Sequence, residues 1–255
     1  METYDAEHVE LHAVRLDAYI FCSPGSGTTV QGTLFSEILD IRAADILRIM
    51  GFRFSGLLAA ITLPLFLVAI LFSGPLLLAW YHQTLLRRVT NTPVAIRNLI
   101  AAPITEELCF RSGLISFLLA SHVSPSRALW LSPLPFALSH VHHVVDLIVH
   151  QGWHPADATA RCLFQAVYTT IFGWLAAFFL LRTGHYAALV VTHSFCNYMG
   201  FPDFGAVANH PRSKELIVAF LGGILGFIVL LKPLTSPSLY GFPSTESSGY
   251  VIFFK

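Results

Sequence analysis

Residues 56–80 read GLLAAITLPLFLVAILFSGPLLLAW, a stretch of 25 residues that holds no charged side chain. A helix needs about 20 consecutive, mainly apolar residues to cross the hydrocarbon core of a bilayer. The stretch therefore predicts a membrane-spanning helix. Two prolines, Pro64 and Pro75, are expected to kink this helix, which membrane helices tolerate because neighbouring groups satisfy the freed backbone.

The composition of the whole chain agrees with a membrane protein. Only 12% of its 255 residues are charged and 55% are hydrophobic, whereas soluble domains carry about 25% charged residues. The formal net charge is zero, so the chain lacks the basic field that a nucleic-acid partner needs. We therefore expect the lipid bilayer, and no nucleic acid, among its partners.

Five more apolar segments follow the first one. Residues 162–181 and 216–231 predict ordinary membrane anchors. The other three, 95–120, 128–149 and 186–201, carry ionisable or amide side chains, which are costly inside a bilayer and usually functional. The sequence thus predicts an all-α fold: a polytopic membrane helical bundle of about six membrane-associated helices with an intramembrane active-site cavity.

Polar stretches bound this helical region at both ends. We expect a polar, partly disordered N-terminal segment at 1–45, a membrane-embedded domain at 46–235 and a C-terminal tail at 236–255. Residues 82–97 carry three arginines, and a short basic loop favours the cytosolic side of a membrane. The four cysteines form no CxxC pair and are interpreted as free thiols.

Residues 105–111 read TEELCFR and place two adjacent carboxylates in an apolar segment. Glu107 and Arg111 are four positions apart, so on a helix they share a face and can pair, which reduces the cost of burying both charges. Glu106 lies about 100° away around the helix and lacks that cation. A carboxylate in such a site holds a proton more readily, which makes Glu106 a candidate general base. A structural ion pair beside a headgroup-facing Glu106 is the alternative.

Residues 136–140 read FALSH, and they place Phe136 and His140 inside the next polar membrane segment. His142 and His143 follow nearer the polar end of that segment. A single histidine in an apolar run is usually a hydrogen-bonded core residue. Because His140 occurs beside a second polar membrane segment, we interpret it as functional, with His142 and His143 as weaker candidates.

Residues 193–197 read HSFCN, so His193 and Asn197 are four positions apart and share a helix face. Both side chains can donate hydrogen bonds. Two fixed donors suit an oxyanion hole, where charge builds on a carbonyl oxygen during acyl transfer. A polar contact between two membrane helices is the structural alternative.

Together these groups form the inventory of a hydrolase: a base, a histidine that helps to position water, and two oxyanion donors. A zinc protease would be expected to carry HExxH, which is absent from the sequence; the histidines together with Glu106 nevertheless leave a metal site as an alternative. A cysteine protease at Cys109 or Cys196 would lack an evident third group to orient its base. A proton-coupled transporter with a Glu–His relay also stays open.

In their order and spacing, the three patterns resemble the type II CAAX prenyl endopeptidase (ABI) family. Residues 102–111 match its EExxxR motif, 136–140 its FxxxH motif and 193–197 its HxxxN motif. Other stretches resemble the eukaryotic, Ras-converting members of the family, namely 50–53, 70–76, 182–185 and 193–202. The resemblance covers about residues 46–242, and it indicates a plant or other eukaryotic member.

The resemblance implies a glutamate-type endopeptidase of the endoplasmic reticulum membrane, with no metal or other cofactor and a site open to the cytosol. Its substrates would be farnesylated or geranylgeranylated CAAX proteins, such as Ras-type small GTPases, from which it would remove the last three residues. The implied roles are activation of water by Glu106 and His140, an oxyanion hole of His193 and Asn197, and support by Glu107, Arg111 and Phe136.

Members of the family have further membrane helices before the position of residue 56, where this chain has an acidic, polar stretch. We therefore expect a shortened or alternatively started product. A catalytically inactive or scaffold form of the same fold, and a zinc-dependent membrane protease, are the alternatives to the metal-independent protease.

Overall fold

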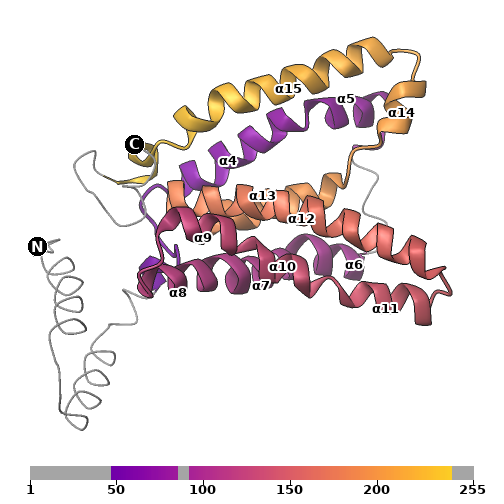
Figure 1. The fold of residues 1–255 in the computed structure, drawn as a ribbon. Coiled ribbons are helices and arrows are strands. Elements are labelled where there is room, and N and C mark those ends of the chain that lie inside the picture. Colours follow the sequence, from indigo (N-terminus) through magenta and orange to yellow (C-terminus); the bar gives the residue numbers. More distant parts are fainter. Residues whose placement is uncertain (1–46, 86–91, 243–255) are drawn as a thin grey trace, which may run out of the picture. The chain divides into compact units, whose positions relative to one another are not determined.

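A computed structural model of the chain describes residues 47–85 and 92–242 (Figure 1). Within these residues the backbone folds into helices and contains no strand. The all-α prediction is therefore confirmed. The expected N-terminal segment at 1–45 and most of the expected tail at 236–255 lie outside the described residues.

Two helices in the described part of the chain are long and apolar enough to cross a membrane: α12 (Pro155–Thr183) and α15 (Ser213–Leu234). Both extend beyond the charge-free stretches that predict them. Helix α12 begins seven residues before residue 162, because the His154 side chain accepts the N–H of Ala156 and Pro155 occupies the first turn. In α12 the charge-free stretch 162–181 thus identifies the apolar part of the helix, whereas the cap at His154 determines where the helix begins.

The stretch at 56–80 forms two helices, α4 (Leu57–Leu71) and α5 (Ser73–Tyr81), which meet at an angle of 71°. The bend lies at Phe72, shortly before Pro75, whose missing N–H cannot bond to the carbonyl of Leu71. Helix α4 continues through Pro64. If the bent pair is counted as one span, the described residues contain three candidate membrane spans.

The segment with the paired carboxylates is helical from 92 to 120, but its register changes along the way. The chain passes through α6 (Thr92–Ile96), the π-helix η1 (Arg97–Ala101), α7 (Ala102–Glu107), the π-helix η2 (Leu108–Gly113) and α8 (Leu114–Ala120). Widened π turns are rare and are found frequently at functional sites. Here they lie on both sides of the short helix that ends with Glu106 and Glu107.

The remaining helices are shorter. The predicted segment 128–149 belongs to three helices, α9 (Pro125–Leu131), α10 (Pro133–Ser139) and α11 (His142–Val149). Pro133 opens α10 and cannot continue α9, because it has no N–H to donate. The others are α13 (Tyr186–Met199), α14 (Phe204–Asn209) and the 3₁₀ turn η3 (Pro237–Tyr240).

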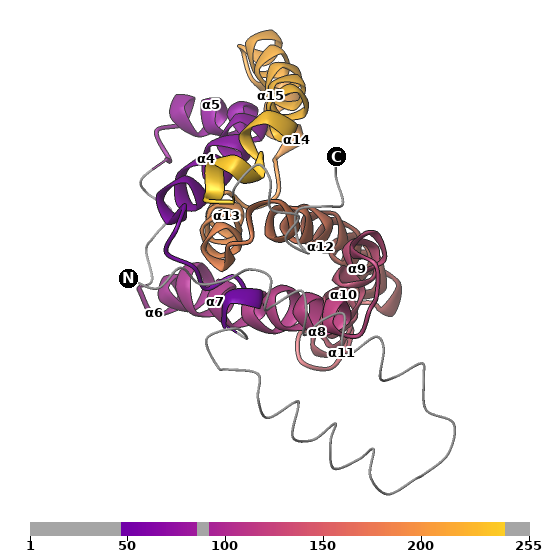
Figure 2. The same ribbon diagram turned by 90° about the vertical axis from the view of Figure 1, so that its left-hand side faces the viewer.

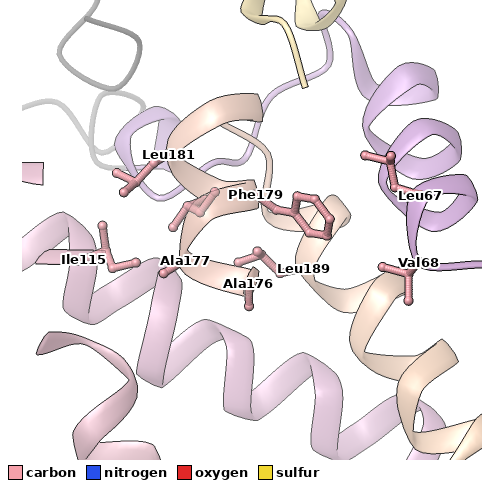
Figure 3. Close-up of a cluster of buried hydrophobic side chains, with 9 residues drawn as sticks. Leu67, Val68, Ile115, Ala176, Ala177, Phe179, Leu181 and Leu189 are labelled. Atoms are coloured by element: carbon pink, nitrogen blue, oxygen red, sulfur yellow. The ribbon is translucent and has the colours of Figure 1, made fainter. Parts of the chain in front are cut away.

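Helix α13 holds a central place in this fold. It packs against α4 on one side and against α7 and η1 on the other, while α15 runs along α4 and α5 (Figure 1). Figure 2 shows α12 and α13 between the group of α4, α5 and α15 and the helices α6 to α8. One apolar core joins these layers through α4, α8, α12 and α13, and it includes Leu67, Ile115, Phe179 and Leu189 (Figure 3). This core fixes the helices that carry the candidate site.

Two stretches, 51–56 and 240–242, interlock beside the turn between α12 and α13; we call them the clasp. Gly56 and Gly241 have φ angles of +76° and +78°, a region that favours glycine. A Cβ on Gly56 would lie 2.3 Å from the carbonyl carbon of Tyr240, so no larger residue fits there. The Arg53 guanidinium covers the Phe242 ring at 3.8 Å, and His185 is fully buried beside Tyr240. This burial lowers the pKa of His185 and favours its neutral form.

Candidate active site

Glu107 lies at the centre of the candidate site and is completely buried. Its Oε1 accepts hydrogen bonds from Nη1 of Arg111 at 3.2 Å and from Nδ1 of His193 at 2.6 Å. The first bond is the ion pair that the four-residue spacing predicts. The second joins the EExxxR segment to α13, so a single carboxylate oxygen links two of the three sequence motifs.

Arg111 is also completely buried, and aromatic rings hold its guanidinium. The guanidinium lies 4.0 Å from the centre of the Phe136 ring and 5.7 Å from that of Phe172. Ring faces attract cations, and the attraction is larger where water is excluded. Phe136 therefore packs against Arg111, and it brings the third motif next to the first two.

Glu106 faces His193 from the other side of the imidazole ring. Oε2 of Glu106 lies 3.7 Å from Nε2 of His193, and the Glu106 side chain is 32% exposed. The histidine ring thus lies between two carboxylates. Nδ1 of the ring faces Glu107, and Nε2 faces Glu106.

His140 lies at the end of α10 and is half-buried. Its Nδ1 is 2.8 Å from the Phe136 carbonyl oxygen, to which it can only donate, so in the neutral ring Nε2 is the acceptor. Its ring meets Phe136 edge-on at 4.7 Å, and Phe136 in turn contacts His193 at 6.4 Å. Among the described residues, His140 is therefore connected to His193 through the Phe136 ring. Glu106 has His193 as its ionisable partner.

The rings of His142 and His143 lie 4.1 Å apart in a tilted arrangement, with His142 exposed and His143 half-buried. Nδ1 of His142 lies 2.5 Å from the carbonyl oxygen of Ser139. The described part of the chain brings no group of three or more His, Cys, Asp or Glu side chains into an arrangement that could hold a metal ion. Cys109 and Cys196 are free thiols in the structure; Cys109 is exposed and Cys196 is half-buried.

Asn197 is exposed, and its Nδ2 donates to the backbone carbonyl of Asn98 at 2.9 Å. In the π register of η1 this carbonyl would bond to the N–H five residues later, but that residue is Pro103, which has none. Asn197 therefore satisfies a carbonyl that the helix leaves open. Asn98 is not predicted from the sequence, where its one signal is the proline five positions later, which matters only in combination with the π turn.

Helix α12 contributes two residues that the sequence analysis also missed. The Phe172 ring contacts the His193 ring at 4.8 Å. Gly173 lets α12 approach Arg111 and α10 closely, because a Cβ there would lie 2.6 Å from Cβ of Pro133 and 3.1 Å from Nη2 of Arg111. A small residue in a membrane span often marks such a close helix contact.

Gly173→Ala is therefore expected to destabilise the protein by about 1–3 kcal/mol, because the added methyl group overpacks the interface. The measurement is denaturant unfolding in detergent micelles. Gly222→Ala on α15 is the matched control, since a Cβ there meets no atom within 4 Å. Equal stability of the two variants would show that Gly173 does not set the contact of α12 with α10.

Comparisons with known proteins agree on one family. A family model described as type II CAAX prenyl endopeptidase Rce1-like matches residues 88–199. The chain is 36% identical to CAAX prenyl protease 2 of Homo sapiens over 223 residues, which are 82% of this chain and 68% of that protein. It is 35% identical to CAAX prenyl protease 2 of Arabidopsis thaliana over 242 residues, with 83% and 76% covered.

CAAX prenyl protease 2 of Caenorhabditis elegans is 32% identical over 194 residues, which are 71% of this chain and 72% of that protein. No solved structure matches the chain. The region matched by the family model includes every candidate site residue named above, from Glu106 to Asn197.

Proposed function

Since the chain belongs to the type II CAAX prenyl endopeptidase family, we propose that it removes the C-terminal tripeptide from farnesylated or geranylgeranylated CAAX proteins. Three relatives that carry the name CAAX prenyl protease 2 support this substrate class. The observation that carries the proposal is the position of His193 between Glu106 and Glu107, with Arg111 buried beside them.

In the proposed reaction, water attacks the carbonyl carbon of the peptide bond after the prenylated cysteine. Glu106 is the base that takes a proton from this water, as its partial exposure allows contact with substrate. Nε2 of His140 is the acceptor that helps to position the water. Collapse of the tetrahedral intermediate breaks the C–N bond, and the proton held by Glu106 passes to the leaving amine of the tripeptide.

His193 and Asn197 are the proposed oxyanion donors. Glu107 lies against Nδ1 of His193, which orients the ring so that Nε2 points toward Glu106 and the site. Asn197 uses one N–H to bond to the Asn98 carbonyl, and this bond fixes the direction of its second N–H. Fixed donors need no reorganisation when charge develops, which is the main advantage of an oxyanion hole.

Glu107 and Arg111 contact no water in this scheme and act as support. Their ion pair keeps the Glu107 carboxylate in place for His193, and Phe136 and Phe172 keep the guanidinium in place. We propose a metal-independent enzyme of the glutamate type, because these side chains already provide a base and an oxyanion hole. The site would lie in the endoplasmic reticulum membrane and open to the cytosol, where Ras-type small GTPases are substrates.

A membrane-embedded site suits a lipidated substrate. Each buried CH₂ of a prenyl chain favours the bilayer by about 0.8 kcal/mol, so the substrate is concentrated at the membrane. Low polarity around the site also strengthens hydrogen bonds to the oxyanion.

The direct test is cleavage of a farnesylated CAAX peptide by the purified full chain in lipid vesicles, with and without an excess of chelator. We expect release of the tripeptide at the same rate in both samples. Loss of release in chelator would overturn the metal-independent mechanism. Binding of the peptide without release would instead indicate an inactive or scaffold form.

Asn197→Ala is expected to lower kcat by about 10²–10³-fold, because it removes one oxyanion donor. Steady-state cleavage of the same peptide measures the effect. Asn209→Ala is the matched control: its Nδ2 also donates to a backbone carbonyl, that of Gly205 in α14, away from the site. Similar activity of both variants would exclude Asn197 from the oxyanion hole.

A further inference from the structure

Tyr186, the first residue of α13, makes a contact with the helix that carries the paired glutamates. Its hydroxyl donates to the backbone carbonyl of Ile104 in α7 at 2.5 Å. Ile104 lies two residues before Glu106. The same carbonyl also accepts the N–H of Leu108, the residue at which α7 gives way to η2. The hydroxyl is therefore a second donor at the turn where the register changes from α to π.

The position of the Tyr186 side chain is itself fixed. Its backbone N–H donates to the carbonyl of Gly51 at 3.0 Å, and its ring packs on Phe52 at 4.9 Å. The stretch just before Gly51 is bonded to the far end of the same helical path, because Ser112 and Ser116 donate to the carbonyls of Met50 and Ile49. Tyr186 thus connects Ile104, which lies just before the π-helix η2, to residues 49–51. That stretch is in turn hydrogen-bonded to Ser112 in η2 and to Ser116 in α8.

Tyr186 also lies on the functional face of α13. His193 and Asn197 follow it by seven and eleven positions, which correspond to about two and three helical turns. All three contact the helical path from 92 to 120: Tyr186 at Ile104, His193 at Glu107 and Asn197 at Asn98.

We propose that Tyr186 is a positioning residue for the reaction, which fixes the α-to-π transition of the helix that carries Glu106 and Glu107. A donor inserted beside a helical hydrogen bond determines how far that turn opens. The opening sets the direction in which the two adjacent carboxylates point. Without the hydroxyl the turn relaxes, Glu106 moves relative to His193, and the base is displaced from the attacking water.

The inference rests on the proposed protease activity, and Tyr186→Phe tests it because this change removes only the hydroxyl. We expect kcat for the farnesylated peptide to fall by about tenfold or more with KM nearly unchanged, since misplacement of a catalytic group costs rate rather than binding. The acid limb of the kcat–pH profile should also shift, because it reports the base in the bound enzyme.

Tyr240→Phe is the matched control. Its hydroxyl also donates to a backbone carbonyl, that of Leu234, but it lies in η3, which carries no candidate site residue. The control should keep the wild-type kcat and pH profile even though it loses an equivalent hydrogen bond. Equal kcat values of the two tyrosine variants, or identical pH profiles of Tyr186→Phe and wild type, would overturn the proposal.

Hydrogen exchange gives a readout that does not depend on activity. Amides of residues 108–113 should exchange several-fold faster in Tyr186→Phe than in wild type or in Tyr240→Phe, because local protection depends on local hydrogen bonds. Unchanged exchange in this segment would overturn the proposal. If wild-type protein releases no tripeptide, the proposed function fails, whereas the exchange result still decides whether Tyr186 holds the turn.

Discussion

Glu106→Gln is expected to lower kcat for cleavage of a prenylated CAAX peptide by about 10²–10⁴-fold, the contribution typical of a general base. Glutamine keeps the size of the side chain but cannot take a proton from water. It also removes the negative charge that faces Nε2 of His193 at 3.7 Å. Single-turnover cleavage in lipid vesicles measures the effect without interference from product release.

Glu215→Gln is the control for this change. Glu215 is exposed on α15, and its carboxylate accepts the Tyr81 hydroxyl at 2.6 Å. The same substitution there should keep activity within about twofold of wild type, because an exposed site tolerates it. Activity of Glu106→Gln within the same range would remove Glu106 from the reaction.

Arg111→Met and Glu107→Gln should each lower the free energy of unfolding by about 3–5 kcal/mol, because each leaves its partner as an uncompensated buried charge. Both side chains are completely buried and their ion pair is 3.2 Å long. The measurement is denaturant titration in detergent micelles, followed by circular dichroism.

The double variant Glu107→Gln/Arg111→Met decides between a charge effect and a packing effect. It removes both charges, so we expect it to be more stable than either single variant. It should still lack activity, since His193 loses the carboxylate that orients it. If the double variant loses as much free energy of unfolding as the two single variants lose together, Glu107 and Arg111 are not energetically coupled.

The sequence predicts contacts within one helix better than contacts between helices. The pairing of Glu107 with Arg111 follows from their spacing, and it is present in the structure. The family resemblance is confirmed by the relatives. The partner of Glu106 was not predictable, because it depends on how α13 packs against α7. The structure pairs it with His193, whereas the resemblance associates it with His140, and this catalytic association stays a prediction.

The helix boundaries and the hydrogen-bond register within the helices could not be predicted from the sequence either. Apolar runs indicate which segments enter the membrane. They do not predict π turns, because a π turn changes the hydrogen-bond register of a helix without changing its composition. The bend of 71° at Phe72 is associated with Pro75, one of the two prolines expected to cause kinks, while Pro64 lies within α4. The sequence places Gly173 in a predicted membrane span, but it does not predict that Arg111 lies next to this glycine, because that depends on how the helices pack.

The clasp has a consequence for how the chain threads through a bilayer. Its two halves, 51–56 and 240–242, touch each other, so if the clasp lies outside the bilayer, both halves are on the same side of it. The chain between them must then cross the membrane an even number of times. With α4 and α5 taken as one span, α12 and α15 bring the candidate spans among the described residues to three, which is odd. If all three of these candidates cross the bilayer, an even total needs an odd number of further crossings, from the paths 92–120 and 125–149 and helix α13.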